Sequence, residues 1–232
     1  LDQVAEASGG GADFIETADE ISDYFQAAVK RMQATVVKNA QLILRLTNGV
    51  VPRQVWRVLP IIENLGYQPL SDEDVQVELG EVDKDEGSAL LVELLISPRP
   101  EGRFRIAQAE ANYDVPALSL VGEKAKTDIM VDFTSDPQQS QQYDAFTMNL
   151  VEKVTDFNLQ TRALNAATMG DTQGASRQLR AAATRLLQVG EEKLAQAALD
   201  EAQNLEEKGA MTSSGTKKLR YSTRKLTRKP TE

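Results

Sequence analysis

The residues best suited to chemistry in this sequence are basic and lie near its C-terminal end. Residues 208–229 contain eight Lys or Arg residues and no Asp or Glu, whereas the rest of the chain carries 18 basic and 35 acidic residues. Ammonium and guanidinium groups at this density can neutralise the phosphates of a nucleic acid or of an anionic membrane. The candidate contact residues are Lys217, Lys218, Arg220, Tyr221, Arg224, Lys225, Arg228 and Lys229.

Two features of the sequence argue against a polyanion as the partner of this basic tail. The rest of the chain is strongly acidic and would repel a polyanion, and Tyr221 is the only aromatic residue among the basic ones. The alternative is that the tail folds back onto the acidic body. We favour docking within the chain or onto a protein, rather than onto nucleic acid or a membrane. The carboxylates expected to pair with the tail include Glu191, Glu192, Glu206 and Glu207.

The composition removes most of the usual catalytic chemistry. The chain has no cysteine and no histidine, which excludes disulfides, thiolate metal sites, a Cys nucleophile and a Ser-His-Asp triad. Carboxylates remain, but Glu78, Glu93 and Glu110 are expected to point outward from strands, where they lack the recessed setting of a catalytic acid. Residues 83–87 (DKDEG) are interpreted as a surface turn, because a calcium loop needs ligands over twelve residues. We therefore predict no enzyme, and no catalytic, cofactor-binding or metal-ligating residue in this chain.

The elements that must position these residues begin with a helix–strand–helix pattern. Apolar residues at helical spacing in residues 1–8 are followed by the glycines at 9–11, which end that helix. Residues 12–16 (ADFIE) are interpreted as a short strand. Because one strand cannot form a sheet, Phe14 and Ile15 are expected to pair with strands outside this chain. The apolar face of the following helix consists of Ile21, Phe25, Ala28, Val29 and Met32.

From about residue 39 the apolar period changes to two, which is the spacing of β-strands. The continuous apolar run at 89–96 (ALLVELLI) suits a central strand, and Asn48-Gly49 predicts a hairpin turn. Within residues 103–113 the alternation shifts by one position after Ile106, which predicts a β-bulge. Six or seven such strands predict an Ig-like antiparallel sandwich. The alternating residues are Leu42, Leu44, Leu46, Val75, Val77, Leu79, Ile129, Val131 and Phe133.

Helical spacing returns after Asp136-Pro137, a capping residue followed by a proline suited to the first helical position. Apolar residues at steps of three or four over 143–168 predict one long helix, and we expect its seam to pack within the chain rather than against a second copy. Two further amphipathic helices follow, and the tail shows no sustained apolar face. The expected helix breaks are Gly170, Gly190 and Gly209.

Both ends of the sequence resemble a known family. "LDQVAEASGG" followed by "ADFIETADEISDYFQ" is similar to the last helix–strand–helix of a von Willebrand factor type A (VWA) domain. The C-terminal end resembles a bacterial subgroup in which the VWA domain continues into a β-sandwich and a helical C-terminus. The matching N-terminal residues are Leu1, Val4, Ala5, Gly9, Gly10, Ile15, Glu20, Ile21 and Phe25. The matching C-terminal residues are Leu199, Glu201, Ala202, Leu205, Glu206, Gly209, Ser213, Gly215, Thr216, Lys217, Leu219, Arg220, Tyr221, Thr223, Arg224 and Leu226.

The resemblance implies a metal-dependent adhesion site that lies outside these residues. In the family this site uses an Asp-x-Ser-x-Ser loop after the first strand, together with a threonine and an aspartate from later loops. The nearest string here, residues 132–136 (DFTSD), has Thr134 and Asp136 where serines are needed. No metal ligand is therefore assigned to this chain, and a divalent cation such as Mg²⁺ is expected only in a VWA portion upstream of Leu1.

Together these observations predict a mixed α and β chain in four parts. They are a VWA remnant (1–36), an Ig-like β-sandwich (37–135), a helical hairpin or three-helix bundle (136–209) and the basic tail (210–232). We expect a non-enzymatic protein-interaction or scaffold protein with a protein partner, and a homo-oligomer remains open. No apolar run reaches about 20 residues and no signal-peptide pattern is present, so we expect a cytoplasmic protein. The alternative is a nucleic-acid- or anionic-membrane-associated module that acts through the tail.

Overall fold

The computed structural model describes residues 14–15, 17–69 and 74–226 of the 232-residue chain. The chain divides into two compact units. We name Thr17–Thr147 the sheet unit, and Leu1–Glu16 together with Met148–Glu232 the helical unit. The expectations for the first helix, for its terminal glycines, and for Arg228 and Lys229 fall outside the described residues.

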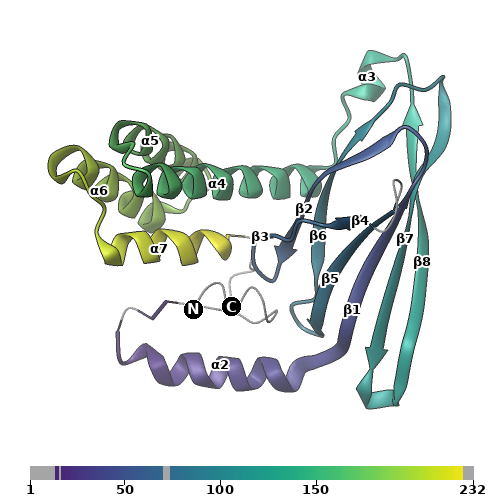
Figure 1. The fold of residues 1–232 in the computed structure, drawn as a ribbon, viewed down its shortest axis with the longest axis horizontal. Coiled ribbons are helices and arrows are strands. Elements are labelled where there is room, and N and C mark those ends of the chain that lie inside the picture. Colours follow the sequence, from purple (N-terminus) through teal and green to yellow (C-terminus); the bar gives the residue numbers. More distant parts are fainter. Residues whose placement is uncertain (1–13, 16, 70–73, 227–232) are drawn as a thin grey trace. The chain divides into compact units, whose positions relative to one another are not determined.

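The sheet unit contains a leading helix and two antiparallel sheets (Figure 1). Its elements are α2 (Glu20–Ala34), β1 (Thr35–Leu46), β2 (Val50–Leu59), β3 (Glu63–Asn64), β4 (Gln68–Pro69), β5 (Asp74–Asp83), β6 (Ala89–Ile96), β7 (Gly102–Val115), η1 (Pro116–Leu118), β8 (Leu120–Phe133) and α3 (Pro137–Ser140). The larger sheet has the order β4-β5-β1-β7-β8, and the smaller sheet has the order β3-β2-β6. The mixed α and β composition and the antiparallel pairing agree with the sequence-based expectation.

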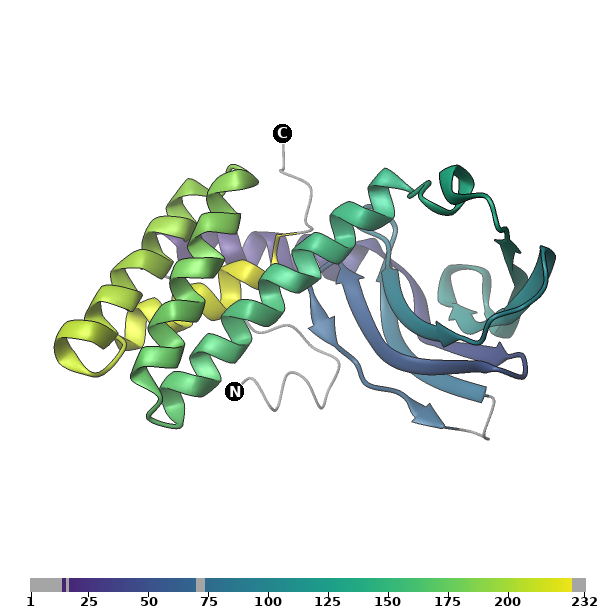
Figure 2. The same ribbon diagram turned by 90° about the horizontal axis from the view of Figure 1, so that it is seen from above.

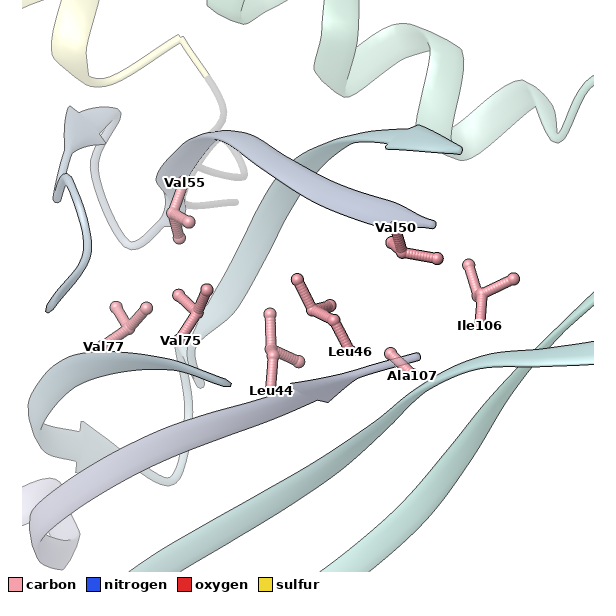
Figure 3. Close-up of a cluster of buried hydrophobic side chains, with 8 residues drawn as sticks. All are labelled: Leu44, Leu46, Val50, Val55, Val75, Val77, Ile106 and Ala107. Atoms are coloured by element: carbon pink, nitrogen blue, oxygen red, sulfur yellow. The ribbon is translucent and has the colours of Figure 1, made fainter. Parts of the chain in front are cut away.

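The core of the sheet unit lies between the two sheets. Figure 3 shows Val50 and Val55 of β2 pointing toward the buried side chains of the larger sheet, among them Leu44. The period-two pattern arises because alternate side chains of a strand face this core. The predicted bulge is confirmed by a register shift between Arg105 and Ala107 in the pairing of β7 with β8. The buried cluster comprises Leu44, Leu46, Val50, Val55, Val75, Val77, Ile106 and Ala107.

One strand prediction was wrong. The apolar run at 89–96 forms β6, which lies at the end of its sheet and pairs only with β2 among the described strands. Phe14 and Ile15 pair with no strand of this chain, residues 12, 13 and 16 are outside the described part, and pairing with strands outside the chain stays a prediction. The error for β6 has a simple physical cause. A continuous apolar run reports that both faces of a strand meet apolar surroundings, and it carries no information about how many of its two edges are paired.

The helical unit is built from four helices of the described chain, α4 (Ala145–Thr168, most of which belongs to this unit), α5 (Thr172–Gln188), α6 (Glu192–Lys208) and α7 (Ser213–Arg224). In Figures 1 and 2, α4, α5 and α6 lie side by side and α7 (yellow) packs on one face of them. The helix breaks were predicted correctly, because Gly170, Gly190 and Gly209 adopt positive φ values of 86°, 82° and 71°.

The long-helix prediction was correct from Leu150 onward but not at its start. Asp136 caps a separate short helix, α3, by accepting a hydrogen bond from the Gln138 amide at 2.8 Å. Tyr143 precedes α4, and Phe146 in its first turn is exposed. Further along α4, the buried Asp156 forms an ion pair with Arg185 of α5.

Candidate functional site

The basic tail forms a capped helix that packs within the chain, which is one of the two modes of docking that we favoured, although the sequence shows no sustained apolar face there. Leu219, Thr223 and Leu226 follow one another at steps of four and three and are all buried. This face was missed in the sequence because its central residue, Thr223, was not counted as apolar. The tail is therefore part of the fold over all of its described residues.

The N-terminus of α7 is held by a buried carboxylate on α6. Glu201 is only 4% exposed and accepts a hydrogen bond from the backbone amide of Thr212 at 2.7 Å and another from the Thr212 hydroxyl. Thr212 is also the N-cap of α7, since its Oγ1 accepts a hydrogen bond from the Gly215 amide at 3.0 Å. The negative carboxylate thus lies beside the positive end of the α7 dipole.

Gly215 is required by the position of Glu201. A Cβ atom at residue 215 would lie 1.9 Å from Oε1 of Glu201 and 2.3 Å from its Cδ. These distances are far below van der Waals contact, so a larger residue would displace the carboxylate that caps the helix. A second anchor joins α7 to α4, because the buried Thr223 hydroxyl donates a hydrogen bond to Oε1 of Gln160.

The anchors of α7 differ from those that we predicted. Glu206 pairs with Arg180 on α5, and Glu207 accepts a hydrogen bond from Gln203 on its own helix. No ion pair of Glu191 or Glu192 with the tail occurs among the described residues. Hydrogen bonds of Thr212 to Glu201 and of Thr223 to Gln160, together with the buried Leu219, therefore anchor α7 in place of the ion pairs that we had named.

The candidate contact residues, five basic residues and Tyr221 in the described part, share one side of α7. At 100° per residue, positions 217, 218, 220, 221, 224 and 225 fall within an arc of about 160° that lies opposite Leu219 and Thr223. Lys217 and Arg220 are exposed, and the other four are partly buried. The Nζ of Lys217 lies 5.7 Å from the centre of the Phe14 ring, which is a cation–π distance. The structure thus brings six of the eight candidates together, and Arg228 and Lys229 lie outside the described residues.

One ion pair of the helical unit joins Arg180 of α5 to Glu206 of α6, and it lowers the pKa of the Glu206 carboxyl. Glu206 accepts hydrogen bonds from Arg180 at 2.8 and 3.0 Å and from the Ser176 hydroxyl. The Arg180 hydrogen bonds and then the Ser176 hydrogen bond lower the pKa of Glu206 from its ordinary value of 4.5 to about 2. The ionised carboxylate therefore stabilises the α5–α6 pair above the ordinary pKa, and this contribution is lost as the pH falls from about 4.5 toward 2.

We expect Glu206→Gln to be less stable than the wild type at pH 7, with the difference shrinking as the pH falls through this window. Urea unfolding at a series of pH values measures it. Glu207→Gln is the matched control, because Glu207 lies on the same helix with only a neighbouring amide as partner. A difference for Glu206→Gln that is equally large at pH 7 and pH 2 would contradict the assignment.

The environment of one carboxylate in the larger sheet, that of Glu110, differs from the prediction. Glu110 points to the outer face as expected, yet it is only 3% exposed because basic side chains cover it. Lys126 lies 2.9 Å away, and Arg45 and Lys124 lie at 3.5 and 3.6 Å. The hydrogen bond from Lys126 is the main cause that lowers the pKa of Glu110, against the opposing effect of burial. A carboxylate with a lowered pKa is a weak base, so this cluster is interpreted as structural.

The leading helix exposes a large apolar surface. Ile21, Phe25 and Val29 recur at every fourth residue of α2 and are 46%, 69% and 50% exposed. These residues belong to the face that the sequence predicted, so the helical period was read correctly. We name them the α2 stripe. A helix of a folded protein normally turns such a stripe toward a core, so this face is suited to contact with residues outside the described part of the chain.

Neither a metal site nor a membrane-spanning helix is found in the described residues. Nowhere in this part of the chain do three or more Asp or Glu side chains gather in a way that would hold a metal ion. The helices described for residues 20–224 are also too short or too polar to cross a bilayer.

Comparisons with known proteins find one matching family model and solved structures of similar fold. Residues 147–229 match the family described as "Sll0103-like, C-terminal alpha-helical domain". A solved structure, von Willebrand factor type A from Catenulispora acidiphila, superposes with a TM-score of 0.76 at 14% identity, over 97% of this chain and 55% of that one. The chain thus spans about half the length of that protein, and the likeness shows the fold alone. No curated protein matches the sequence.

A second solved structure, the ArnB paralog VWA2 from Sulfolobus acidocaldarius, is also similar. It is 14% identical, with a TM-score of 0.40, over 82% of this chain and 41% of that one. At this score the likeness adds nothing to the argument.

Proposed function

We propose that this chain is the C-terminal part of a bacterial VWA-type protein that binds another protein and catalyses no reaction. The fold likeness supports the VWA assignment, and the match over residues 147–229 supports the placement of the helical unit at the C-terminal end. In this proposal a divalent cation is held by the VWA portion and not by these residues. The two sheets serve as an Ig-like spacer, and the protein acts in the cytoplasm, with self-association as a secondary possibility.

The observation that carries the proposal is the α2 stripe. Three large apolar side chains on one face of a 15-residue helix expose a continuous hydrophobic surface to water. Burying such side chains contributes about 1.5–3 kcal/mol each, which is enough to make α2 a stable docking element. Asp23 and Lys30 lie on the opposite side of the helix and keep that side hydrated. The stripe therefore fits an apolar protein groove.

The proposal is tested by placing a photo-crosslinking phenylalanine analogue at position 25 in the producing bacterium. Because the Phe25 side chain is directed outward, we expect irradiation to give one main covalent protein adduct, identified by mass spectrometry of the linked peptides. The same amino acid at position 30 is the matched control, since Lys30 is on the same helix and equally reachable but faces away from the stripe. A cross-link only within the same polypeptide, an adduct with lipid or nucleic acid, or equal adducts at positions 25 and 30 would refute the proposal.

The alternative partner, a polyanion on the basic side of α7, gives a distinct result. Counter-ion release makes such binding strongly salt-dependent. The slope of log K against log salt concentration falls by about one unit for each cation removed from the protein. We expect DNA and anionic vesicles to bind the chain no more tightly than they bind a Lys217→Gln, Arg220→Gln variant at physiological salt. Tight, salt-sensitive binding that this variant loses would favour the alternative.

A further inference from the structure

The basic side of α7 has an aromatic contact with a residue from the other end of the sequence. The Nζ of Lys217 lies 5.7 Å from the centre of the Phe14 ring. Phe14 belongs to the helical unit, so this contact lies within one compact unit. A cation above an aromatic face is attracted by the ring quadrupole. The contact therefore joins the segment that precedes α2 to the C-terminal helix.

The carboxylates of α4, α5 and α6 do not neutralise this side of α7. Asp156 of α4 and Glu206 of α6 each form an ion pair with an arginine of α5, and Glu201 accepts hydrogen bonds at the start of α7. The ion pairs among the described residues of the helical unit are these two, and neither includes a residue of α7. Carboxylates that pair with the basic side therefore come from residues outside the described part or from another molecule.

Charge distinguishes the two segments of the helical unit that lie outside the described part. Residues 227–232 contain two basic residues and one acid, so they add to the positive charge of the tail. Residues 1–16 contain four carboxylates and no Lys or Arg, and Phe14 lies among them. We name residues 1–16 the acidic segment. Its carboxylates are Asp2, Glu6, Asp13 and Glu16.

We propose that the acidic segment is the partner of the basic side of α7. The Phe14 ring contacts Lys217, and the carboxylates of the segment neutralise the Lys and Arg side chains beside it. This pairing connects the two ends of the chain within the helical unit. It also screens the basic side from phosphate groups, so the tail serves to dock the acidic segment. The inference concerns a contact within the chain and stands without the function proposed above.

A separate polyanion is a poorer occupant of the same surface. The acidic segment belongs to the same chain, so its contact with α7 does not require two molecules to associate. A nucleic acid has to displace this tethered segment and also approach a chain with a net charge of −9. The pairing therefore predicts that the basic side becomes available to a polyanion only when the acidic segment loses its charge.

The first test measures this screening with a fluorescent single-stranded DNA oligonucleotide and the 232-residue chain, by anisotropy at physiological salt. In the neutralised variant all four carboxylates are replaced, by Asp2→Asn, Glu6→Gln, Asp13→Asn and Glu16→Gln. We expect it to bind DNA more tightly than the wild type, by about fivefold for each cation that becomes available to a phosphate. Adding Lys217→Gln and Arg220→Gln to this variant should remove the gain.

The matched control removes four negative charges from the same unit, at and along α6. The control variant carries Glu191→Gln, Glu192→Gln, Asp200→Asn and Glu207→Gln, at residues that are all exposed. Its net charge equals that of the neutralised variant, so it reports the effect of net charge alone, and we expect a much smaller gain. Equal gains in the two variants, no gain in either, or a wild type that already binds DNA as tightly as the neutralised variant would overturn the proposal.

A double-mutant cycle tests the Phe14 contact itself. Phe14→Leu removes the ring and keeps an apolar side chain, and Lys217→Met removes the charge and keeps a side chain of similar length. We expect the two changes to be coupled by about two- to fivefold in the equilibrium constant of unfolding in urea, the effect of one cation–π pair. Lys193→Met is the control partner, since Lys193 is an equally exposed lysine on α6, and it should show no coupling with Phe14→Leu. Equal coupling in both pairs, or none in either, would mean that the acidic segment does not occupy α7, and would overturn the proposal.

Discussion

Replacing Leu219 with alanine is expected to lower the free energy of unfolding of the helical unit by about 2–5 kcal/mol, which is the range for removing a fully buried leucine side chain. Leu219 is 0% exposed and belongs to the buried face of α7. The loss comprises the transfer free energy of the deleted atoms and the cost of the cavity they leave. Urea unfolding of the chain, with hydrogen exchange of the α7 amides, measures both the stability and the release of this helix.

The matched control for this change is Leu187→Ala. Leu187 is a leucine of the same unit, at the end of α5, but it is 52% exposed. Its truncation is expected to change the free energy of unfolding by about 0.5 kcal/mol or less. If the two variants lose equal stability, or if the α7 amides exchange as slowly in Leu219→Ala as in the wild type, α7 is not an integral part of the helical unit.

Replacing Gly215 with alanine is expected to destabilise the helical unit by about 1–3 kcal/mol, the usual range for overpacking. The sign of this effect is informative. In a helix that faces solvent, glycine to alanine stabilises by up to about 1 kcal/mol, because alanine loses less backbone entropy on folding. Here the new Cβ would lie 1.9 Å from Oε1 of Glu201, and Glu201 cannot move away without breaking its hydrogen bonds to Thr212.

Two further variants separate the clash of the new Cβ atom with Glu201 from the higher helix propensity of alanine. Ser214→Ala changes the neighbouring exposed residue of α7 and should be nearly neutral. In a Glu201→Ala background the clash is absent, so Gly215→Ala should become stabilising. The coupling between the two sites follows from the double-mutant cycle. A stabilising Gly215→Ala in the wild-type background would show that Glu201 does not occupy this position in solution.

The sequence predicted those parts of the fold that depend on local patterns. Leu44 and Val77 lie in the core because alternation along a strand assigns every second residue to one face. Gly170 and Gly190 end their helices because a left-handed residue is needed there, and glycine adopts that conformation without strain. The bulge after Ile106 was also visible, since it shifts the alternation by one position.

The parts that the sequence did not predict depend on contacts between distant residues. α7 is anchored by Thr212 to Glu201, 11 residues earlier, and by Thr223 to Gln160, 63 residues earlier. No periodicity encodes such pairs, and polar anchors give no apolar signal. The edge position of β6 was missed for a related reason, since strand order is set by the whole sheet. The apolar face of α2 was predicted correctly, but only the structure shows that Phe25 is exposed.

The central claim, that another protein covers the α2 stripe, is tested most directly by hydroxyl-radical footprinting of Phe25 in the purified chain and in the producing cell. Met169, at the end of α4, is the internal reference because it is 86% exposed and oxidises readily, while Phe25 is 69% exposed. We predict that Phe25 is oxidised in the purified chain and is strongly protected in the cell, relative to Met169. An unchanged ratio of Phe25 to Met169 oxidation in the two settings would contradict the claim.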